Sequence, residues 1–284
     1  LFLNRLKKQK NVSYSFLTEG TNFANLEIKN ISFSWENNLS YSINDENRDF
    51  DKILKIFFED KNITKISNDI KQDIKLLSKK NIKVHGGVFD IKLAHYLINP
   101  DINHDIVNLS KNYLNISLNI KSSDLKSSEI SELAYQLKPL LEKDLEKYNQ
   151  IDLYNRIEIP LLKTLALMEN EGINLDIKFL DKLSEKTKTE VNDLAEKIYK
   201  EAGAEFNISS PKQLGEILFD QMKISKNPKK TKTGQYSTSE EVLSELAKDN
   251  SFVKLILEYR SISKLLNTYI DSLPKQISSR TNRI

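Results

Sequence analysis

The segment FNISSPKQLGEILFDQMKISKNPKKTKTGQYSTSEEVLSELA, residues 206–247, places a short basic stretch between two helix-forming stretches. Ser210 is a typical N-cap residue, and Pro211 suits the first turn of a helix. Four lysines follow between residues 226 and 232, and the basic run ends before a glycine. The next helix is predicted to begin near Ser239, where a hydroxyl precedes glutamates in capping-box style. The pattern therefore predicts two helices joined by an exposed, mobile basic loop.

The rest of the second half is predicted to be almost entirely helical. From about residue 130 onward, apolar residues recur at three- and four-residue steps, which is the period of an amphipathic helix. Long helices are expected to end at Gly172 and Gly203, because glycine readily adopts the backbone conformation that closes a helix. We expect an extended all-α region over residues 151–284.

The first 116 residues alternate between strand and helix patterns. Three segments with strand periodicity follow one another at short spacing and predict a meander: 11–18, 26–35 and 39–43. Helix, strand, helix and short strand patterns come next, before a helix that stops at Pro100. The serine- and lysine-rich segment 117–131 predicts a loop. We expect an α/β domain over residues 1–150.

Composition limits the possible chemistry. The chain has 284 residues, a formal net charge of +3 and no cysteine, so disulfides, thiolate nucleophiles and cysteine-based zinc sites are excluded. The three histidines are scattered, which argues against a histidine-rich metal site. No apolar run reaches the ~18–20 residues that cross a bilayer, so we expect a cytoplasmic protein with no membrane partner. Because the chain begins with Leu1 rather than Met, we expect a piece of a longer protein.

An ordered set of segments resembles bacterial family A DNA polymerases of the DNA polymerase I type. Segments 206–222, 229–247 and 256–274 resemble the thumb region, and EIPLLKTLALMENEGINLD (158–176) resembles the connecting helix before it. In the first half, the segments FLTEG (16–20), SNDIKQDIKLL (67–77) and FDIKLAHYLINPDINHDIVNLSKNYLNI (89–116) resemble the 3′–5′ proofreading exonuclease domain. The resemblance implies a mixed sheet flanked by helices, of RNase H-like fold, followed by a helical thumb. The palm and fingers of the family are absent from these residues.

The resemblance also implies where exonuclease ligands would lie. Two-metal hydrolysis needs several carboxylates, which in this family stand on one strand and two helices. Leu17 stands where the family has its first aspartate, while Glu19 and Asp73 match the next two acidic positions. The third motif is best matched by EISEL, which puts Glu129 at a tyrosine and Leu133 at an aspartate. With Glu19 and Asp73 as the only residual metal candidates, we interpret the exonuclease site as vestigial.

The thumb resemblance implies contacts to duplex DNA. A thumb grips the product duplex through phosphates and the minor groove, without reading its sequence. The candidate DNA-binding residues are Lys229, Lys230, Thr231, Lys232, Ser237, Thr238, Arg260, Lys264, Asn267 and Thr268. The last four recur at helical spacing, and Leu257, Leu265 and Tyr269 are expected to pack against the protein.

Three hypotheses follow. The first is a portion of a DNA-directed DNA polymerase, with an inactive proofreading domain and a thumb that binds primer-template DNA during replication or repair. No cofactor is expected in this chain, and Mg²⁺ is expected for the full-length polymerase. The expected state is a monomer in the cytoplasm, associated with the nucleoid of a bacterium. The alternatives are an active metal-dependent 3′–5′ exonuclease, with Glu129 or Glu132 as a substitute ligand, and a helical interaction module that does not bind DNA.

Overall fold

The computed structural model describes residues 2–20, 25–118, 121, 125–278 and 281–284. It divides into two compact units, Leu1–Gly172 and Ile173–Ile284. The boundary predicted between residues 150 and 151 lies within the first of these units. The helices that follow residue 150 belong to the first unit because Tyr154, Ile159 and Leu162 are buried in its core. The Tyr154 hydroxyl also accepts a hydrogen bond from the Asp90 backbone N–H at 2.7 Å.

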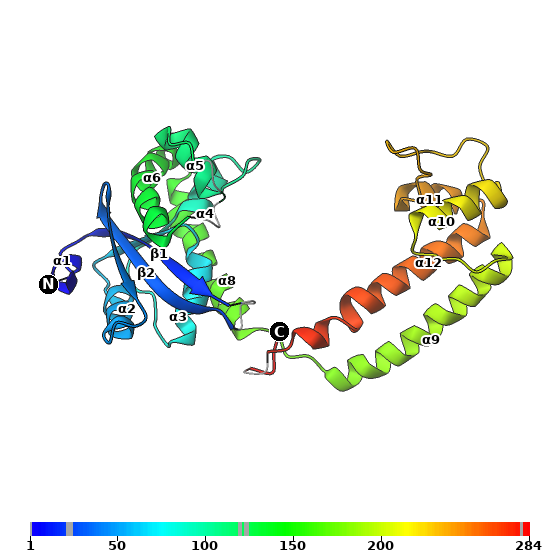
Figure 1. Ribbon diagram of the computed structural model, residues 1–284, viewed down its shortest axis with the longest axis horizontal. Coiled ribbons are helices and arrows are strands. Elements are labelled where there is room, and N and C mark those ends of the chain that lie inside the picture. Colours follow the sequence, from blue (N-terminus) through cyan, green and yellow to red (C-terminus); the bar gives the residue numbers. More distant parts are fainter. Residues whose placement is uncertain (1, 21–24, 119–120, 122–124, 279–280) are drawn as a thin grey trace. The chain divides into compact units, whose positions relative to one another are not determined.

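The first unit is built on a five-stranded mixed sheet, which confirms the predicted fold class (Figure 1). The strands are β1 (Asn11–Glu19), β2 (Glu27–Glu36), β3 (Leu39–Asn44), β4 (Thr64–Ser67) and β5 (Val88–Asp90). Their order across the sheet is β3-β2-β1-β4-β5. The first three strands pair antiparallel, as the predicted meander requires, whereas β4 pairs parallel with both β1 and β5. Strand β1 therefore lies at the centre of the sheet.

Helices cover both faces of this sheet (Figure 1). They are α1 (Phe2–Leu6), α2 (Phe50–Glu59), α3 (Ile70–Lys79), α4 (Ile91–Ile98), α5 (Ile106–Leu114), α6 (Ser127–Lys147), α7 (Ile151–Leu153), the π-helical turn η3 (Tyr154–Glu158) and α8 (Ile159–Glu171). One core contains α1, α2 and the apolar side of α3, and the other contains α4, α5, α6 and α8. Helix α6 begins inside the segment that was predicted to be a loop, of which residues 119–120 and 122–124 lie outside the described residues.

The period of two along β1 sends its side chains to different surroundings. Val12 and Tyr14 are completely buried in the core that contains α2 and α3. Ser13, between them, points to the other face, where its Oγ donates hydrogen bonds to backbone carbonyls of Ser34 and Ser131. The face opposite Tyr14 therefore carries small polar side chains beneath α6.

Helix α6 is held against the sheet by buried hydroxyl groups. The Ser127 Oγ lies 2.8 Å from the Ser32 Oγ. One turn later, the Ser131 Oγ lies 3.2 Å from the Ser34 Oγ and 3.0 Å from the Ser40 Oγ. Small side chains allow the helix to approach the strands closely, and each hydroxyl that is removed from water finds a polar partner. This network fixes which face of α6 meets the sheet.

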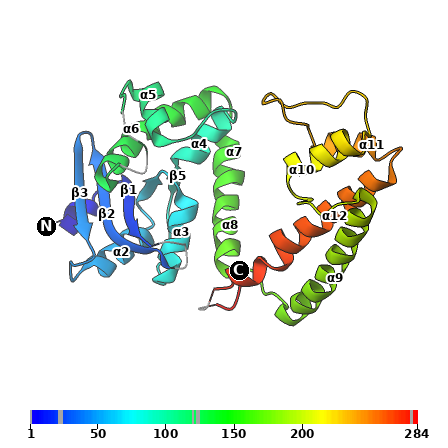
Figure 2. The same ribbon diagram turned by 45° about the vertical axis from the view of Figure 1, so that its right-hand side comes forward.

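The second unit consists of two long helices and a helical cap. Helices α9 (Ile177–Ala202) and α12 (Ser251–Leu265) lie side by side in both views (Figures 1 and 2). The remaining elements are α10 (Pro211–Gly215), the π-helical turn η4 (Glu216–Gln221), α11 (Glu240–Leu246), the π-helical turn η5 (Leu266–Ile270) and the 3₁₀ turn η6 (Leu273–Gln276). Its core joins α9, α12 and the cap through residues such as Ile198, Leu218 and Phe252.

The predicted ends of these helices are confirmed. The Ser210 side chain accepts a hydrogen bond from the Gln213 backbone N–H, and Ser239 caps α11 in the same way. Gly203 ends α9 with a φ of 73°, in the left-handed region that favours glycine. No helix in the described part of the chain is long and apolar enough to cross a membrane.

We expect Ser131→Val to lower the free energy of unfolding of the first unit by roughly 2–4 kcal/mol, because it overfills a tight contact and removes a partner from buried hydroxyls. Urea denaturation can be followed by the fluorescence of Trp35, the single tryptophan of the chain, which is buried in this unit. Ser128→Val, in the same helix, is the matched control, because the Ser128 side chain is only partly buried. Equal losses for the two variants would contradict a structural role for the hydroxyl network.

Candidate functional site

The residues matched to the first acidic motif lie near the end of β1. Leu17 is 50% exposed and pairs with Asn30 on β2, and Glu19 pairs with Glu27. Because residues two apart on a strand share a face, both belong to the same face as Ser13, which α6 covers further along. Glu19 is exposed, and Leu17 brings a hydrocarbon surface instead of an oxygen ligand. This end of β1 therefore offers one carboxylate to solvent.

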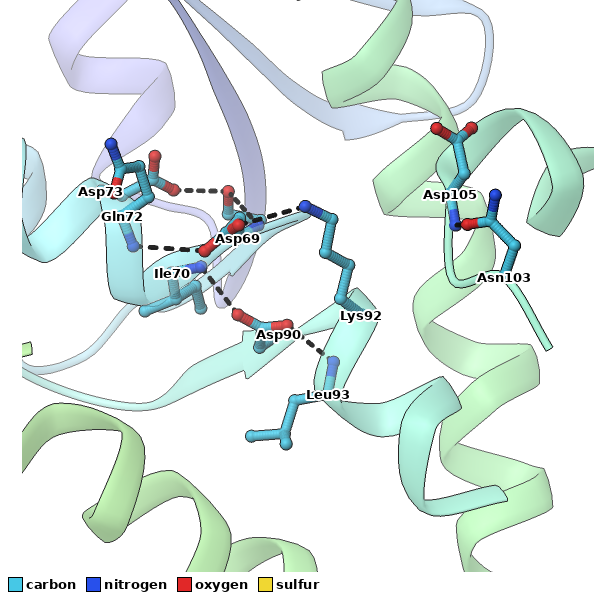
Figure 3. Close-up of polar contacts among 10 residues, drawn as sticks. Asp69, Ile70, Gln72, Asp73, Asp90, Lys92, Leu93, Asn103 and Asp105 are labelled. Atoms are coloured by element: carbon cyan, nitrogen blue, oxygen red, sulfur yellow. Dashed lines mark hydrogen bonds and ion pairs between the residues drawn. The ribbon is translucent and has the colours of Figure 1, made fainter. Parts of the chain in front are cut away.

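Asp73, the second candidate ligand, lies in different surroundings. It is 8% exposed, and its Oδ2 accepts a hydrogen bond from the Ser67 Oγ at 2.6 Å (Figure 3). The buried hydroxyl of Tyr14 is close enough for the charge of Asp73 to act on it. Tyr14 and Leu17 are three positions apart along the strand and so belong to opposite faces of β1. Asp73 therefore makes its contacts on the Tyr14 side of β1, whereas Leu17 belongs to the other face.

Burial controls the acidity of this region. Removal from water raises the pKa of Asp73 to about 7, and the hydrogen bond from Ser67 only partly opposes that shift. Burial and then the nearby Asp73 charge raise the pKa of Tyr14 well above its ordinary value. Within the described part of the chain, the Tyr14 hydroxyl has no hydrogen-bond partner of ordinary geometry. Asp73 is thus a buried acid whose carboxylate is hydrogen-bonded to Ser67.

Asp90 is a buried acid that the sequence analysis did not single out. Its Oδ2 accepts a hydrogen bond from the Ile70 backbone N–H at 2.7 Å, and its Oδ1 accepts one from the Leu93 N–H at 2.8 Å (Figure 3). These bonds join the N-termini of α3 and α4. Burial raises its pKa to about 7 even though both N–H groups favour the charged form. The available sequence signal was an aspartate between a short strand and a helix, a typical N-cap position.

The stretch EISEL does not supply the missing ligand. Leu133 is buried in the core with Ile66 and Val88, and Leu17 is outside that core. Glu129 instead accepts a hydrogen bond from the Lys126 backbone N–H at 2.7 Å. The register that placed Leu133 at a metal position is therefore not supported by the packing of α6.

The serines of α6, rather than Leu133, approach the face of β1 that carries Leu17. The Ser127 Oγ donates to the Asn30 Oδ1 at 3.0 Å, and Asn30 pairs with Leu17. Glu132, which was considered as a substitute ligand, makes a contact of a different kind. Its Oε1 accepts a hydrogen bond from the Asn38 backbone N–H at 3.1 Å. Neither this carboxylate nor Glu129 therefore takes the place of an acid beside Glu19.

The donor set does not fit two magnesium ions. Two-metal hydrolysis needs carboxylate oxygens that converge on a common point. Among the described residues, no group of three or more histidine, cysteine, aspartate or glutamate side chains is placed to hold a metal ion. Glu19 and Asp73, the residual candidates, are not part of such a group.

The basic segment of the second unit is an ordered hairpin, not a free loop. The Ser237 N–H donates to the Lys229 carbonyl, and the Thr231 N–H donates to the Gln235 carbonyl, both at 2.8 Å. Lys230 pairs with Tyr236 between these bonds. The turn is closed by Gly234, whose φ of 84° favours glycine, and its N–H donates to the Thr231 carbonyl. We call residues 229–237 the basic hairpin.

The lysines of the basic hairpin are exposed and can contact phosphates, whereas Ser237 and Thr238 at its C-terminal end are less accessible. Lys229, Lys230, Thr231 and Lys232 are all exposed, and Ser237 is partly buried. Thr238 is only 6% exposed. The Arg260 Nη1 donates to the Thr238 carbonyl at 2.7 Å.

Thr238 and Arg260 therefore bind each other and connect the end of the hairpin to α12. Burial lowers the pKa of Arg260, which is consistent with a guanidinium partly withdrawn from solvent. Because Thr238 is buried, its predicted role as a direct DNA contact is not supported.

The remaining candidates form an exposed polar surface at the end of α12 and in η5. Lys264, Asn267 and Thr268 are exposed, which leaves them available for binding. Leu265 and Tyr269 were expected to pack, but they are 49% and 50% exposed. That expectation is wrong for these two residues because the buried side of this segment runs instead through Leu266 and Ile270.

Family models match both units. Residues 2–159 match the 3′-5′ exonuclease family, and residues 177–284 match DNA polymerase family A. Because the first match covers more than half of the chain, the chain belongs to the 3′-5′ exonuclease family, in the form that precedes a DNA polymerase family A region. The matches agree with the mixed sheet of the first unit and the helical second unit.

The chain is also similar to individual curated proteins. The chain is 35% identical to DNA polymerase I of Synechocystis over 240 residues, which are 78% of this chain and 24% of the relative. It is 36% identical to DNA polymerase I of Bacillus subtilis over 241 residues, which are 79% of this chain and 27% of the relative. The chain thus spans about a quarter of the length of these relatives.

A solved structure shares the fold. It is the POL domain of Pol1 from M. smegmatis, in complex with DNA primer-template and dNTP. The TM-score is 0.84 at 24% sequence identity, and the match covers 100% of this chain and 50% of that one.

We expect the stability of the first unit to fall as pH rises toward 7. The pKa of Asp73 is higher in the folded chain than in the unfolded chain, so the folded state holds its proton between about pH 4 and pH 7 while the unfolded state does not. Asp73→Asn should therefore gain roughly 2–4 kcal/mol relative to the natural chain between pH 5 and pH 8. Urea titrations monitored by Trp35 fluorescence measure this difference.

The matched control is Asp51→Asn on α2, where the carboxylate is exposed and paired with Lys80. Its curve should run parallel to that of the natural chain. A parallel curve for Asp73→Asn as well would show that Asp73 is charged in the folded protein throughout this range.

Proposed function

We propose that this chain is a portion of a DNA-directed DNA polymerase of the DNA polymerase I type. Its first unit is an inactive proofreading domain, and its second unit is a thumb that binds duplex DNA without sequence preference. The identity to DNA polymerase I of Synechocystis and of Bacillus subtilis supports this assignment. Because the chain spans about a quarter of these relatives, the polymerase reaction itself is assigned to the full-length protein, with Mg²⁺ as its cofactor.

Leu17 is the observation that carries the proposed loss of exonuclease activity. A leucine at the position of a metal-binding aspartate removes both oxygens and adds apolar bulk at the same point. Asp73 supplies one further carboxylate, which accepts a hydrogen bond from Ser67, and two acidic groups are too few to hold two cations. The retained sheet and helices then serve as a scaffold rather than as a nuclease.

The basic hairpin and the exposed polar surface of α12 and η5 support the proposed DNA contact. Lysines on an exposed hairpin can neutralise phosphates, and such contacts do not depend on base sequence. The M. smegmatis protein of similar fold was solved with DNA primer-template, which makes the same ligand a reasonable one for this chain. We propose one copy of the chain per primer-template, and association with bacterial nucleoid DNA in replication or repair.

We expect the chain to release no nucleotides from a 3′-labelled single strand with Mg²⁺ or Mn²⁺, above the level of a Glu19→Gln variant. Glu19 is exposed, so this control should fold normally, and Asp73→Ala is a second control. Release of the label can be followed on a denaturing gel, with an active proofreading enzyme run in parallel. Metal-dependent cleavage that is lost in both variants would mean that a substitute carboxylate completes the site.

We expect the chain to bind duplex DNA weakly, with an affinity that falls steeply with salt and barely depends on sequence. Changing Lys229, Lys230 and Lys232 together to alanine should lower the salt slope by roughly 1 for each phosphate that the variant no longer neutralises. Fluorescence anisotropy with two unrelated duplexes at several salt concentrations measures both quantities. The matched control is the triple alanine change at Lys7, Lys8 and Lys10, which are exposed in the first unit and carry the same charge.

An unchanged slope in the hairpin variant would refute the assignment of the basic hairpin. Absence of binding by the natural chain at low salt would favour a helical interaction module that does not bind DNA.

A further inference from the structure

Tyr236 is the residue through which the basic hairpin contacts the rest of the second unit. Its Oη donates a hydrogen bond to the Asp220 Oδ1 at 2.6 Å. Its ring lies against Phe219, with centroids 5.0 Å apart, and both partners belong to η4. The hairpin is thus joined to a helical element by a charge-assisted hydrogen bond and an aromatic contact.

Gly215 allows this close approach. A Cβ atom added at Gly215 would lie 2.9 Å from the Tyr236 Cβ, which is closer than Cβ atoms come in folded proteins. Gly215 is at the end of α10, immediately before η4, and its backbone is helical, so its role concerns space and not conformational freedom. Tyr236 therefore fits a site that only a residue without a side chain can provide.

The strand pairing within the hairpin places its lysines in different surroundings. Residues directly opposite each other in an antiparallel pair share a face. Lys230 is opposite Tyr236, and its Nζ lies over the Tyr236 ring, 5.2 Å from the centroid. Lys229 belongs to the other face, and Lys232 lies in the turn. One lysine is engaged with the docking tyrosine, and the other two are exposed elsewhere on the hairpin.

We propose that Tyr236 is a positioning residue that fixes the basic hairpin on η4 and so presents Lys229 and Lys232 to a DNA phosphate backbone. This proposal rests on the proposed function of the second unit as a DNA-binding thumb. A hairpin that is ordered before binding loses less conformational freedom when it meets its ligand. Tyr236 acts through the lysines and need not touch DNA itself.

Tyr236→Phe is the most selective test, because it keeps the ring and removes only the hydroxyl that reaches Asp220. Backbone hydrogen exchange in the hairpin, at the amides of Thr231, Gly234 and Ser237, should become faster. Affinity for a short duplex at low salt should fall roughly three- to tenfold, since a more mobile hairpin loses more freedom on binding. Tyr199→Phe is the matched control on α9, and both readouts should be unchanged in it.

Substitutions at Gly215 and Asp220 change the same contact from the other side. Gly215→Ala should speed exchange in the hairpin by forcing Tyr236 out of place. Asp220→Asn, which keeps an acceptor for the hydroxyl, should retain more protection than Asp220→Ala. Exchange that is unaltered in Tyr236→Phe and Gly215→Ala would overturn the proposed attachment, whether or not the chain binds DNA.

A double-mutant comparison tests whether Tyr236 acts through the lysines. In a chain that already carries alanine at Lys229, Lys230 and Lys232, Tyr236→Phe should cause no further decrease in DNA affinity. An equal decrease in both backgrounds would overturn the positioning role. If the natural chain binds no DNA, the proposed function fails with its positioning step, and the exchange data alone then decide whether Tyr236 holds the hairpin in place.

Discussion

The central position of β1 is the constraint on which the first unit depends. It pairs antiparallel with β2 on one side and parallel with β4 on the other, so both of its edges are hydrogen-bonded, and helices cover its faces over most of its length. Its even-numbered residues, including Val12 and Tyr14, fill the core beside α2 and α3. Its odd-numbered residues meet the serines of α6 and then continue to Leu17 and Glu19. Tyr14 and Leu17 therefore belong to opposite faces of the strand.

The buried acids of this unit accept hydrogen bonds from groups that belong to the fold itself. Asp73 is hydrogen-bonded to Ser67 at the Tyr14 side, and Asp90 joins the first turns of α3 and α4. Burial raises the pKa of both to about 7, which means that their charged forms cost free energy at neutral pH. A working metal site would offset that cost with cations. In this chain, hydrogen bonds from the described residues offset part of that cost. The Ser67 hydroxyl donates to Asp73, and backbone N–H groups at the N-termini of α3 and α4 donate to Asp90.

The second unit combines a rigid attachment with an exposed charge. Tyr236, Gly215 and Asp220 hold the basic hairpin on the helical cap, and Arg260 holds its C-terminal end on α12 through Thr238. Residues that sequence reasoning grouped as one set of DNA contacts thus divide into two kinds. The lysines and the residues at the end of α12 remain accessible, whereas Thr238 and Arg260 are used within the protein.

The sequence by itself determined the features that depend on local physics and on chemical identity. The strands of the meander, the cap at Ser210 and the helix end at Gly203 follow from residue period and backbone preference, and the structure contains all three. The absence of an oxygen ligand at Leu17 is likewise fixed by the residue itself. These statements need no knowledge of distant neighbours.

Only the tertiary structure decided what depends on contacts between residues far apart in the chain. It placed residues 151–172 in the compact first unit, because Tyr154 and Leu162 are buried in the core of that unit. It buried Asp73 beside Ser67 and left Glu19 exposed, and it exposed Leu265. Spacing along one element predicts which residues share a face, but burial of that face depends on what packs against it, and this is set by the assembled fold.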